Sequence, residues 1–493
     1  MAISVGPLPI SPISLSHSPP SRKDEMLSRS YSDPIPLPRR FSVLKERLVS
    51  GKESTLAPSW QRLIQSLSDE VDLVSSLGPQ AVPTIDFSDI KKPRLAEVFR
   101  ESLRQRGVAI IRNVIPRDTA KDLYEDAMGY LDENAQRRPS TPQESDLQEL
   151  YWSAAQIKAR GHPNVLEAQR FAMGLWTSKD PKARVATNFP IIYADRMRTG
   201  RGAADRQTPA AAHIDGGSVE RWETDGYGRA GTYNEIFQGQ WEEYNPWESS
   251  TRLTVTSDLY HKAGACSIFR MYQGWLALSP GPSSMRACPM LRHATAYFLL
   301  RPFFSPSTPS SSPTSEDWTF TSPPNSILHG ALPSYAQEIN PSIHPHLQLA
   351  RSLIDIPDLQ PGDYLIWHPD LIHSITPSTP SSPSASVMYL PCVPLTQTNA
   401  LYLSRQRKSF LLGCPGPDFF DGCGGYSSGN HGRGEAHYVG RPGVQEVSDA
   451  GGEEGLRAMG LLPWDEEEAD TDFEREVLAM ANGILFPDLY DMY

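Results

Sequence analysis

The chain of 493 residues carries 58 acidic and 46 basic side chains, so its formal net charge is −12 at pH 7. No segment is dense in Lys and Arg, which argues against nucleic acid or an anionic membrane as the main partner, because both bind basic surfaces. Hydrophobic residues make up 39% of the chain, enough for a large core, but no apolar run reaches membrane-spanning length. We expect a soluble globular protein with additional tails.

The cysteines and the chain ends indicate a cytoplasmic setting. Five cysteines lie far apart without a Cys-x-x-Cys pair, so neither a disulfide framework nor a zinc ribbon is expected. The first 20 residues lack an early basic residue and are broken by prolines, unlike a signal peptide or a transit helix. The last three residues are not a peroxisomal signal.

The N-terminal third is predicted to contain helices around a buried strand. Residues 1–38 are rich in Ser and Pro and poor in apolar side chains, so we expect a disordered tail. From residue 39 apolar side chains recur at helical spacing, as Phe41, Leu44 and Leu48 show. Short strands are predicted at residues 81–87 and 107–116, and helices are predicted at residues 93–105, 118–134 and shortly before residue 188.

The rest of the chain is predicted to be mainly extended. Apolar segments typical of strands lie at residues 189–198, 252–255, 265–272, 275–278, 285–288, 294–300 and 387–393. Many short strands in succession favour an antiparallel sandwich or barrel over a βαβ fold. The aromatic segment at residues 223–250 could form a flap, with Phe237, Trp241 and Tyr244 on one helical face.

The predicted domain spans residues 39–412 and is interrupted by two surface insertions. Residues 305–324 and 376–386 are rich in Ser, Pro and Thr and lie between apolar segments. A helix is predicted at residues 399–412. Residues 413–493 are interpreted as a glycine-rich loop followed by an acidic C-terminal extension.

Two short motifs contain residues that can bind a metal. His213 and Asp215 are two residues apart, so on an extended chain both side chains point to the same face. A second apolar segment contains His368 and His373, whose odd spacing makes them face opposite ways on one strand, and we choose His373 as the third ligand. Two imidazoles and one carboxylate leave open positions on a metal, as in non-haem Fe(II) enzymes. Alternatively, the first motif is a surface loop with a structural Asp215.

The second motif resembles a known family of oxygenases. The segment from Pro361 to His373 looks like the distal-histidine strand of phytanoyl-CoA dioxygenase-like Fe(II)/2-oxoglutarate oxygenases, where the later histidine binds iron. His368 would then pack behind the site. Four further stretches resemble the DUF1479 family, which is itself similar to these oxygenases. These stretches begin at Tyr193, His213, Gly231 and Phe269 and end at Arg198, Trp222, Trp241 and Leu278.

The resemblance covers residues 39–412 and implies both a fold and cofactors. The implied fold is a double-stranded β-helix, or cupin-like jelly roll, of α+β or mainly β class with outer helices and long loops. The implied metal is Fe(II), bound by His213, Asp215 and His373, and the implied cosubstrate is 2-oxoglutarate.

One feature departs from the oxygenase pattern. Those enzymes usually hold the distal carboxylate of 2-oxoglutarate with an Arg on the last core strand, about ten residues after the distal histidine. Here that region contains Val387 and Tyr389, and no Arg occurs before Arg405. A buried carboxylate needs a cationic partner, so we expect Arg270 to take this role. Further candidates beside the cosubstrate are Tyr193, Arg196, Arg198 and Arg286.

The sequence thus predicts a dioxygenase that hydroxylates a small molecule with dioxygen. Arg221 and Trp222, which directly follow the first motif, are expected to line the substrate pocket. A cupin-like binding protein or isomerase with Zn(II) or no metal is a second interpretation, and the missing strand Arg keeps it open. A third is a scaffold whose Ser/Pro segments recruit partners.

Overall fold

The computed structural model describes residues 34–137, 146–200, 210–261, 265–308, 317–376, 383–419 and 434–490. Residues 1–33 of the predicted disordered tail lie outside this part of the chain. So do residues 309–316 and 377–382 of the two predicted insertions, and residues 420–433 of the predicted glycine-rich loop.

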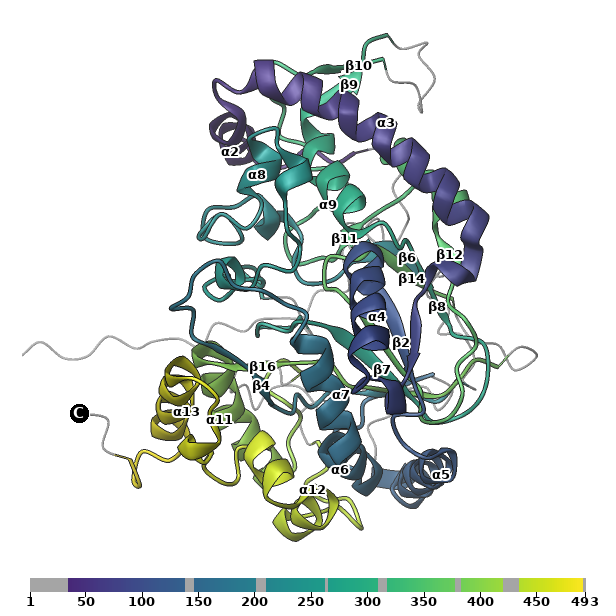
Figure 1. Cartoon of the computed structure of the whole chain (residues 1–493), viewed down its shortest axis with the longest axis vertical. Coiled ribbons are helices and arrows are strands. Elements are labelled where there is room, and N and C mark those ends of the chain that lie inside the picture. The colour runs from purple at the N-terminus through teal and green to yellow at the C-terminus, as the bar shows by residue number, and fades with distance from the viewer. Residues whose placement is uncertain are drawn as a thin grey trace, which may run out of the picture. The chain divides into compact units, whose positions relative to one another are not determined.

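The protein is a mixed α/β structure with two main sheets (Figure 1). The seven-stranded sheet has the order β1-β2-β13-β7-β15-β5-β3, and the five-stranded sheet has the order β11-β6-β14-β8-β12. The strands of the larger sheet are β1 (Thr84–Asp86), β2 (Val108–Arg112), β3 (Leu147–Gln148), β5 (Met197–Arg198), β7 (Gln273–Ala277), β13 (Tyr364–Trp367) and β15 (Val387–Tyr389). Those of the smaller are β6 (Ala210–Ile214), β8 (Met285–Ala287), β11 (Gln337–Glu338), β12 (Ile354–Asp355) and β14 (His373–Ile375).

Two small antiparallel pairs complete the β-structure: β4 (Val185–Pro190) with β16 (Pro394–Thr396), and β9 (Phe304–Pro306) with β10 (Trp318–Phe320). The described strands do not close into a barrel. The second pair overlaps the predicted insertion at residues 305–324, so part of that segment is paired as antiparallel strands.

Consecutive core strands alternate between the two main sheets. The chain passes from β5 to β6, β7 and β8, and later from β12 to β13, β14 and β15, changing sheet at each step. Successive side chains along β7 point to opposite faces of the sheet and belong to different hydrophobic cores. Trp275 and Ala277 belong to the core between the sheets, whereas Leu276 belongs to the core on the other face. The period of two in the sequence therefore reflects burial on both faces of this strand.

Helices cover the outer face of the seven-stranded sheet (Figure 1). They are α4 (Pro93–Arg106), α5 (Arg117–Glu133), α6 (Ala154–Gly161) and α7 (Pro163–Met173). The predicted helix, glycine and strand around Gly107 are confirmed. Gly107 ends α4 with φ of 74°, and a Cβ at this position would lie 2.9 Å from the Cβ of Leu291. Only glycine satisfies both conditions.

A second helical layer packs beside the sheets. It begins with α2 (Arg40–Val49) and the 25-residue α3 (Glu53–Leu77), and α3 contacts α9 (Leu291–Leu300) and α10 (Leu349–Ser352). Trp60 of α3 stacks on Phe304 with 4.4 Å between ring centroids. The predicted strand at residues 294–300 is wrong because α9 is buried on nearly all sides, so it shows no polar face from which a helical period could be read.

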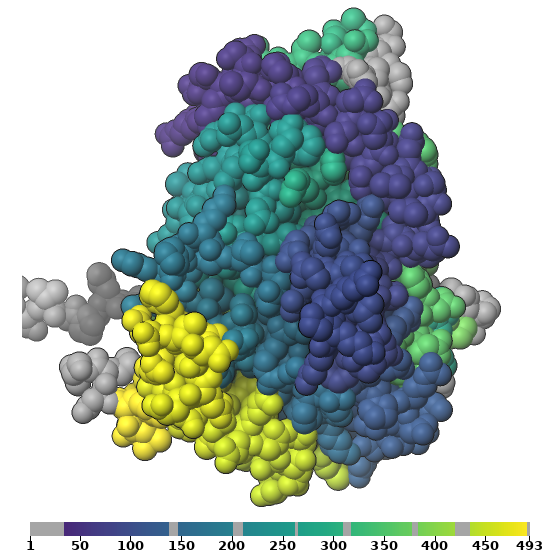
Figure 2. Space-filling model, in the orientation of Figure 1, coloured from purple at the N-terminus to yellow at the C-terminus, as the bar shows by residue number. Residues whose placement is uncertain are grey.

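The C-terminal extension contains two helices, α12 (Val444–Ala458) and α13 (Asp472–Leu485), that pack on the rest of the protein. The helix before it, α11 (Gln397–Leu412), matches the helix predicted at residues 399–412. Helix α11 packs on α13, and α12 packs on α6, so the yellow C-terminal surface in Figure 2 adjoins the blue surface of α6 and α7. No helix in the described ranges has the length and apolar character needed to cross a membrane.

Four further predictions of local structure are wrong. Residues 252–255 and 265–272 form no strand among the described residues, and residues 189–198 are split between β4 and β5. In the aromatic segment, α8 (Asn234–Phe237) ends before Trp241, which begins a separate turn. Phe237, Trp241 and Tyr244 are all buried, so their apolar pattern reflects core packing and not one helical face.

Buried histidines make the fold sensitive to acid. Burial and then the charge of Arg301 lower the pKa of His344 to about 3. Because the unfolded chain binds a proton near pH 6.5, acidification below this pH favours unfolding. Between about pH 5.5 and 4, His344 should lower the free energy of unfolding by about 1.4 kcal/mol per pH unit. Denaturant titrations should show a shallower pH dependence in His344→Gln than in wild type, and equal slopes would contradict the assignment.

Candidate metal centre

The two histidines of the predicted metal site lie directly opposite each other on neighbouring strands. β6 and β14 are antiparallel, and His213 is the register partner of His373. Opposed residues of an antiparallel pair project to the same face with their Cβ atoms about 5 Å apart. The imidazole centroids are 4.5 Å apart. Asp215, two residues after His213, returns to this face.

The ligand atoms of the three side chains form a compact group. One nitrogen or oxygen from each of His213, Asp215 and His373 lies within 4.8 Å of the others. His213 Nε2 is 3.7 Å from Asp215 Oδ1, and His373 Nε2 is 3.4 Å from Asp215 Oδ2. This set of donors fits a divalent metal with two imidazole ligands and one carboxylate ligand.

Backbone carbonyls orient both imidazoles. His213 Nδ1 is 2.9 Å from the carbonyl oxygen of Ala211, and His373 Nδ1 is 3.0 Å from that of Leu371. When Nδ1–H donates to a carbonyl, the lone pair of a neutral imidazole is on Nε2. In both residues Nε2 is the nitrogen that faces Asp215, so the rings are held in the orientation that metal binding requires.

The carboxylate of Asp215 is ionised. Burial raises its pKa, but His373, His213 and Arg270 outweigh burial and hold the pKa well below its usual range. An ionised carboxylate between two imidazoles provides the charge that a divalent cation needs.

A cavity of about 330 Å³ opens beside the three side chains. Its opposite wall is formed by the seven-stranded sheet, which contributes Trp275, Trp367 and Tyr389. Trp275 contacts both others, with ring centroids 5.4 Å from Trp367 and 5.6 Å from Tyr389. This volume is typical of a site for a small organic ligand.

Arg270 lines this cavity. It does not lie on the core strand predicted at residues 265–272, because the chain before β7 is irregular. Burial lowers its pKa, but Cys266, Asp215, Tyr193 and Asp195 outweigh burial and raise it. Within the described ranges, no carboxylate forms an ion pair with Arg270. Its guanidinium therefore contributes a positive charge to the cavity wall.

The other predicted arginines are already paired. Arg196 and Arg198 line the cavity, but Arg196 Nε is 3.3 Å from Asp195 Oδ1 and Arg198 Nη2 is 2.7 Å from Asp146 Oδ2. Arg286 pairs with Asp355 outside the cavity lining. Arg270 is thus distinguished from Arg196 and Arg198 by the absence of a carboxylate partner among the described residues.

Tyr193, the remaining predicted cofactor contact, also lines the cavity. Its hydroxyl donates a 2.7 Å hydrogen bond to Asp418, and its ring stacks on Tyr402. Because its hydroxyl is bonded to Asp418, Tyr193 offers the cavity mainly its aromatic ring.

Arg221 and Trp222, which the sequence analysis placed in the pocket wall, lie outside the cavity lining. A short helical turn at Val219–Arg221 folds the chain back into the protein. Arg221 is fully buried, and the Trp222 indole donates to the carbonyl of Leu299 at 3.1 Å. Both side chains therefore pack on the buried side of the first motif and do not face the cavity.

The prediction that His368 and His373 share one strand is wrong. β13 ends at Trp367, the chain turns at residues 368–372, and His373 begins β14 in the other sheet. Pro369 favours this break because it has no backbone N–H for a ladder hydrogen bond. His368 is fully buried, stacks on Trp176 at 5.1 Å, and has a pKa lowered by burial to about 3, so it packs behind the site as a neutral ring.

Sequence reasoning missed the aromatic wall formed by Trp275, Trp367 and Tyr389. Alternation along the three strands could have placed each side chain on one face. It could not show that the three faces meet opposite the metal ligands, because that depends on pairings between distant segments.

The comparison with family models assigns the chain to a family. The model described as Gig2-like matches residues 35–461. The chain belongs to the Gig2-like family. This confirms the predicted resemblance to DUF1479, because a similar crystal structure, GlcNAc Inducible Gene 2 from Candida albicans, carries that designation.

Relatives match over most of their length. The Candida albicans structure has a TM-score of 0.81 and 27% identity and covers 92% of this chain and 96% of its own. A candidate oxidoreductase from Salmonella typhimurium LT2 has a TM-score of 0.67 and 26% identity, covering 86% and 96%. The uncharacterized protein YbiU of Escherichia coli K12 is 29% identical over 381 residues, 73% of this chain and 85% of YbiU.

Metal binding should depend on the three side chains named above. His213→Ala or Asp215→Ala should lower the affinity for Fe(II) or Co(II) by more than the roughly 10–100-fold typical for loss of an outer partner. The melting temperature of the metal-free protein should change little, because the apolar core between the sheets is retained. Metal content after dialysis, with the exposed His437→Ala as control, checks this. Unchanged metal content in both site variants would refute the assignment.

Proposed function

We propose that the protein is a non-haem Fe(II)- and 2-oxoglutarate-dependent dioxygenase that hydroxylates a small molecule. The observation that carries this proposal is the group formed by His213, Asp215 and His373, with oriented imidazoles and an open cavity on one side. With 2-oxoglutarate and dioxygen, bound Fe(II) supplies the oxidising chemistry, which yields succinate, CO2 and an oxygen atom for a C–H bond of the substrate. The similar Salmonella structure is named as a candidate oxidoreductase, which is compatible with this proposal.

The chain itself would position the reactants. His213 and His373 would bind the metal through Nε2 and Asp215 through a carboxylate oxygen, all from one side. Arg270 would hold the distal carboxylate of 2-oxoglutarate, because a guanidinium forms strong, oriented pairs with carboxylates and Arg270 has no such pair among the described residues.

The substrate would pack against the opposite wall. Trp275, Trp367 and Tyr389 offer apolar ring faces and exclude water from the space beside the metal ligands. Tyr193 and Arg196 would border the cosubstrate, as the sequence analysis expected. The proposed ligands are therefore a small organic molecule and dioxygen.

The proposed core fold is a double-stranded β-helix. Support comes from the alternation of consecutive strands between the two main sheets, and from the antiparallel pairing of β6 with β14 and β14 with β8. We assign this core to residues 39–412, with residues 413–493 as an extension. Cys266, Cys288, Cys392 and Cys414 are free thiols, which fits the proposed cytoplasmic location.

A second candidate function is a metal-binding or isomerase-type cupin without oxygenase activity. The observation that favours it is that β15 (Val387–Tyr389) contains no Arg, although the oxygenase pattern has one on this part of the chain. A scaffold role remains a third interpretation, and deletion of residues 1–38 would then abolish function.

Turnover of 2-oxoglutarate to succinate tests the proposed function. Anaerobically Fe(II)-loaded protein exposed to dioxygen should form succinate from 2-oxoglutarate, with His213→Ala inactive. Metal binding without succinate across a panel of small-molecule substrates would favour the cupin-type alternative.

Arg270 should determine the affinity for 2-oxoglutarate. Arg270→Met removes a charged partner worth about 1.5–3 kcal/mol, so the KM for 2-oxoglutarate should rise roughly 10–100-fold. Arg286→Met removes a guanidinium outside the cavity and should leave this KM unchanged. Equal KM values for both variants would remove Arg270 from the site.

A further inference from the structure

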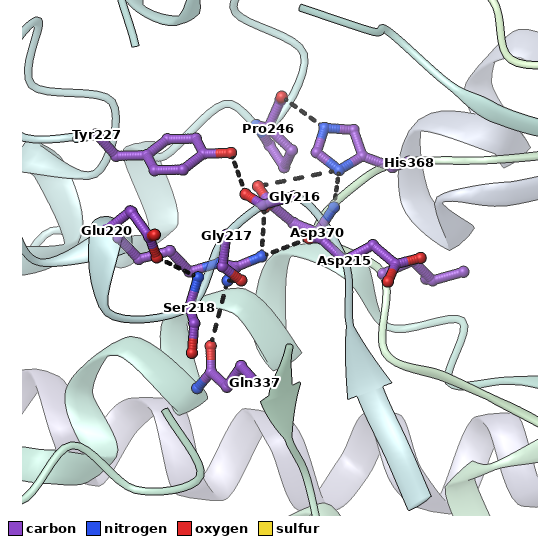
Figure 3. Close-up of polar contacts among 12 residues, drawn as sticks. Asp215, Gly216, Gly217, Ser218, Glu220, Tyr227, Pro246, Gln337, His368 and Asp370 are labelled. Carbon is purple, nitrogen blue, oxygen red and sulfur yellow. Dashed lines mark hydrogen bonds and ion pairs between the residues drawn. The ribbon is translucent and has the colours of Figure 1, made fainter. Parts of the chain in front are cut away.

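Two turns next to the ligand-bearing strands meet beneath the candidate metal centre. One turn follows β6 and contains Gly216 and Gly217, and the other joins β13 to β14 and contains His368 and Asp370. Figure 3 shows Asp370 and His368 beside the glycine turn, with the Tyr227 hydroxyl directed at the Gly216 carbonyl. Side chains between these turns can therefore fix the position of Asp215 relative to His373.

Asp370 is the centre of this contact. Its side chain is fully buried, and its oxygens accept hydrogen bonds from Arg252 Nη2 at 2.7 Å and from the Tyr233 hydroxyl at 3.1 Å. Arg221 Nη2 lies 3.5 Å from Asp370 Oδ1. The backbone N–H of Asp370 donates to His368 Nδ1 at 3.0 Å, which fixes the turn itself.

Arg221 links Asp370 to the first motif. Its Nη2 donates to the backbone carbonyl of Asp215 at 2.7 Å, and its Nη1 donates to that of Gly217. Gly216 and Gly217 have φ values of 77° and 115°, so this turn has no side chain of its own to hold it against the core. Hydrogen bonds from Arg221 and Tyr227 to three successive carbonyls take that role.

The charges within this cluster make Asp370 indispensable to it. Two fully buried guanidiniums, those of Arg221 and Arg252, share this one carboxylate. Burial raises the pKa of Asp370, but Arg252, His368 and Arg221 outweigh burial and hold it well below its usual range. Without the carboxylate, the two buried guanidiniums would lose the ion-pair partner that they share, and Arg221 would be held only by hydrogen bonds to neutral groups.

We propose that Asp370 is a positioning residue for the metal centre, because it holds Arg221 in place and Arg221 holds the Asp215 backbone opposite His373. The inference rests on the proposed metal site. It adds a fourth residue on which metal binding depends, although Asp370 is not one of the three proposed ligands and does not line the cavity. Loss of this link should weaken metal binding by about 10–100-fold, as for other partners that orient metal ligands.

The chain offers a matched control at the other end of β13. Asp363, just before β13, is also buried at 1% exposed and accepts hydrogen bonds from Arg112 Nη1 at 2.5 Å and the backbone N–H groups of Asn113 and Gln360. It lies at the other end of β13 from the metal ligands. Asp363→Asn should therefore destabilise the fold without altering the metal site.

The test measures the binding of Co(II) to metal-free full-length protein, well below each variant's melting temperature. Asp370→Asn should bind Co(II) about 10–100-fold more weakly than wild type, with a changed visible Co(II) absorption spectrum. Asp363→Asn should show wild-type affinity and spectrum despite a lower melting temperature. Equal Co(II) affinity in Asp370→Asn and wild type, or equal weakening in both variants, would overturn the positioning role.

A milder variant covers the case in which Asp370→Asn does not fold. Arg221→Lys keeps the charge but lacks the planar fork that reaches Asp370 and two carbonyls together, so it should also weaken Co(II) binding. Wild-type affinity in Arg221→Lys would overturn the proposal. Failure of wild-type protein itself to bind Co(II) would instead refute the metal site on which the proposed function rests.

Discussion

The candidate metal centre depends on one cross-strand pair. His213 and His373 are 160 residues apart in the sequence but are register partners on β6 and β14, so the sheet brings their imidazoles to one face. The strand period then brings Asp215 to the same face. Carbonyls two residues before each histidine orient the rings. A slip of one residue in this pairing would turn one imidazole away and abolish the site.

The two main sheets contribute different groups to the proposed active site. The five-stranded sheet carries the two histidines of the proposed metal site, with Asp215 directly after β6, and the seven-stranded sheet supplies the aromatic wall across the cavity. Irregular segments contribute the cation of Arg270 and the buried links through Arg221 and Asp370. The regular strands thus set the distance between the two walls, while turns and loops adjust charge and orientation around the metal ligands.

Local sequence patterns predicted only some of these features. The period of two placed His213 and Asp215 on one face, and helix and glycine signals located α4 and Gly107 correctly. Helix α9 was predicted as a strand, because a helix buried on nearly all sides has no polar face that would show a helical period. His373 was chosen as the third ligand from its motif, in agreement with the family resemblance, but its place opposite His213 depends on strand pairing. Asp370 was not identified, because its partners Arg221 and Arg252 come from distant turns whose meeting no local pattern encodes.

The most direct test of the account is crystallography of the Fe(II)-loaded protein grown without oxygen, with anomalous scattering used to locate the iron. The account predicts one iron per chain, bonded to His213 Nε2, His373 Nε2 and a carboxylate oxygen of Asp215, with its remaining positions facing the cavity. Iron bound elsewhere, or no iron between these three side chains at full loading, would contradict the proposed metal centre and the dioxygenase function that depends on it.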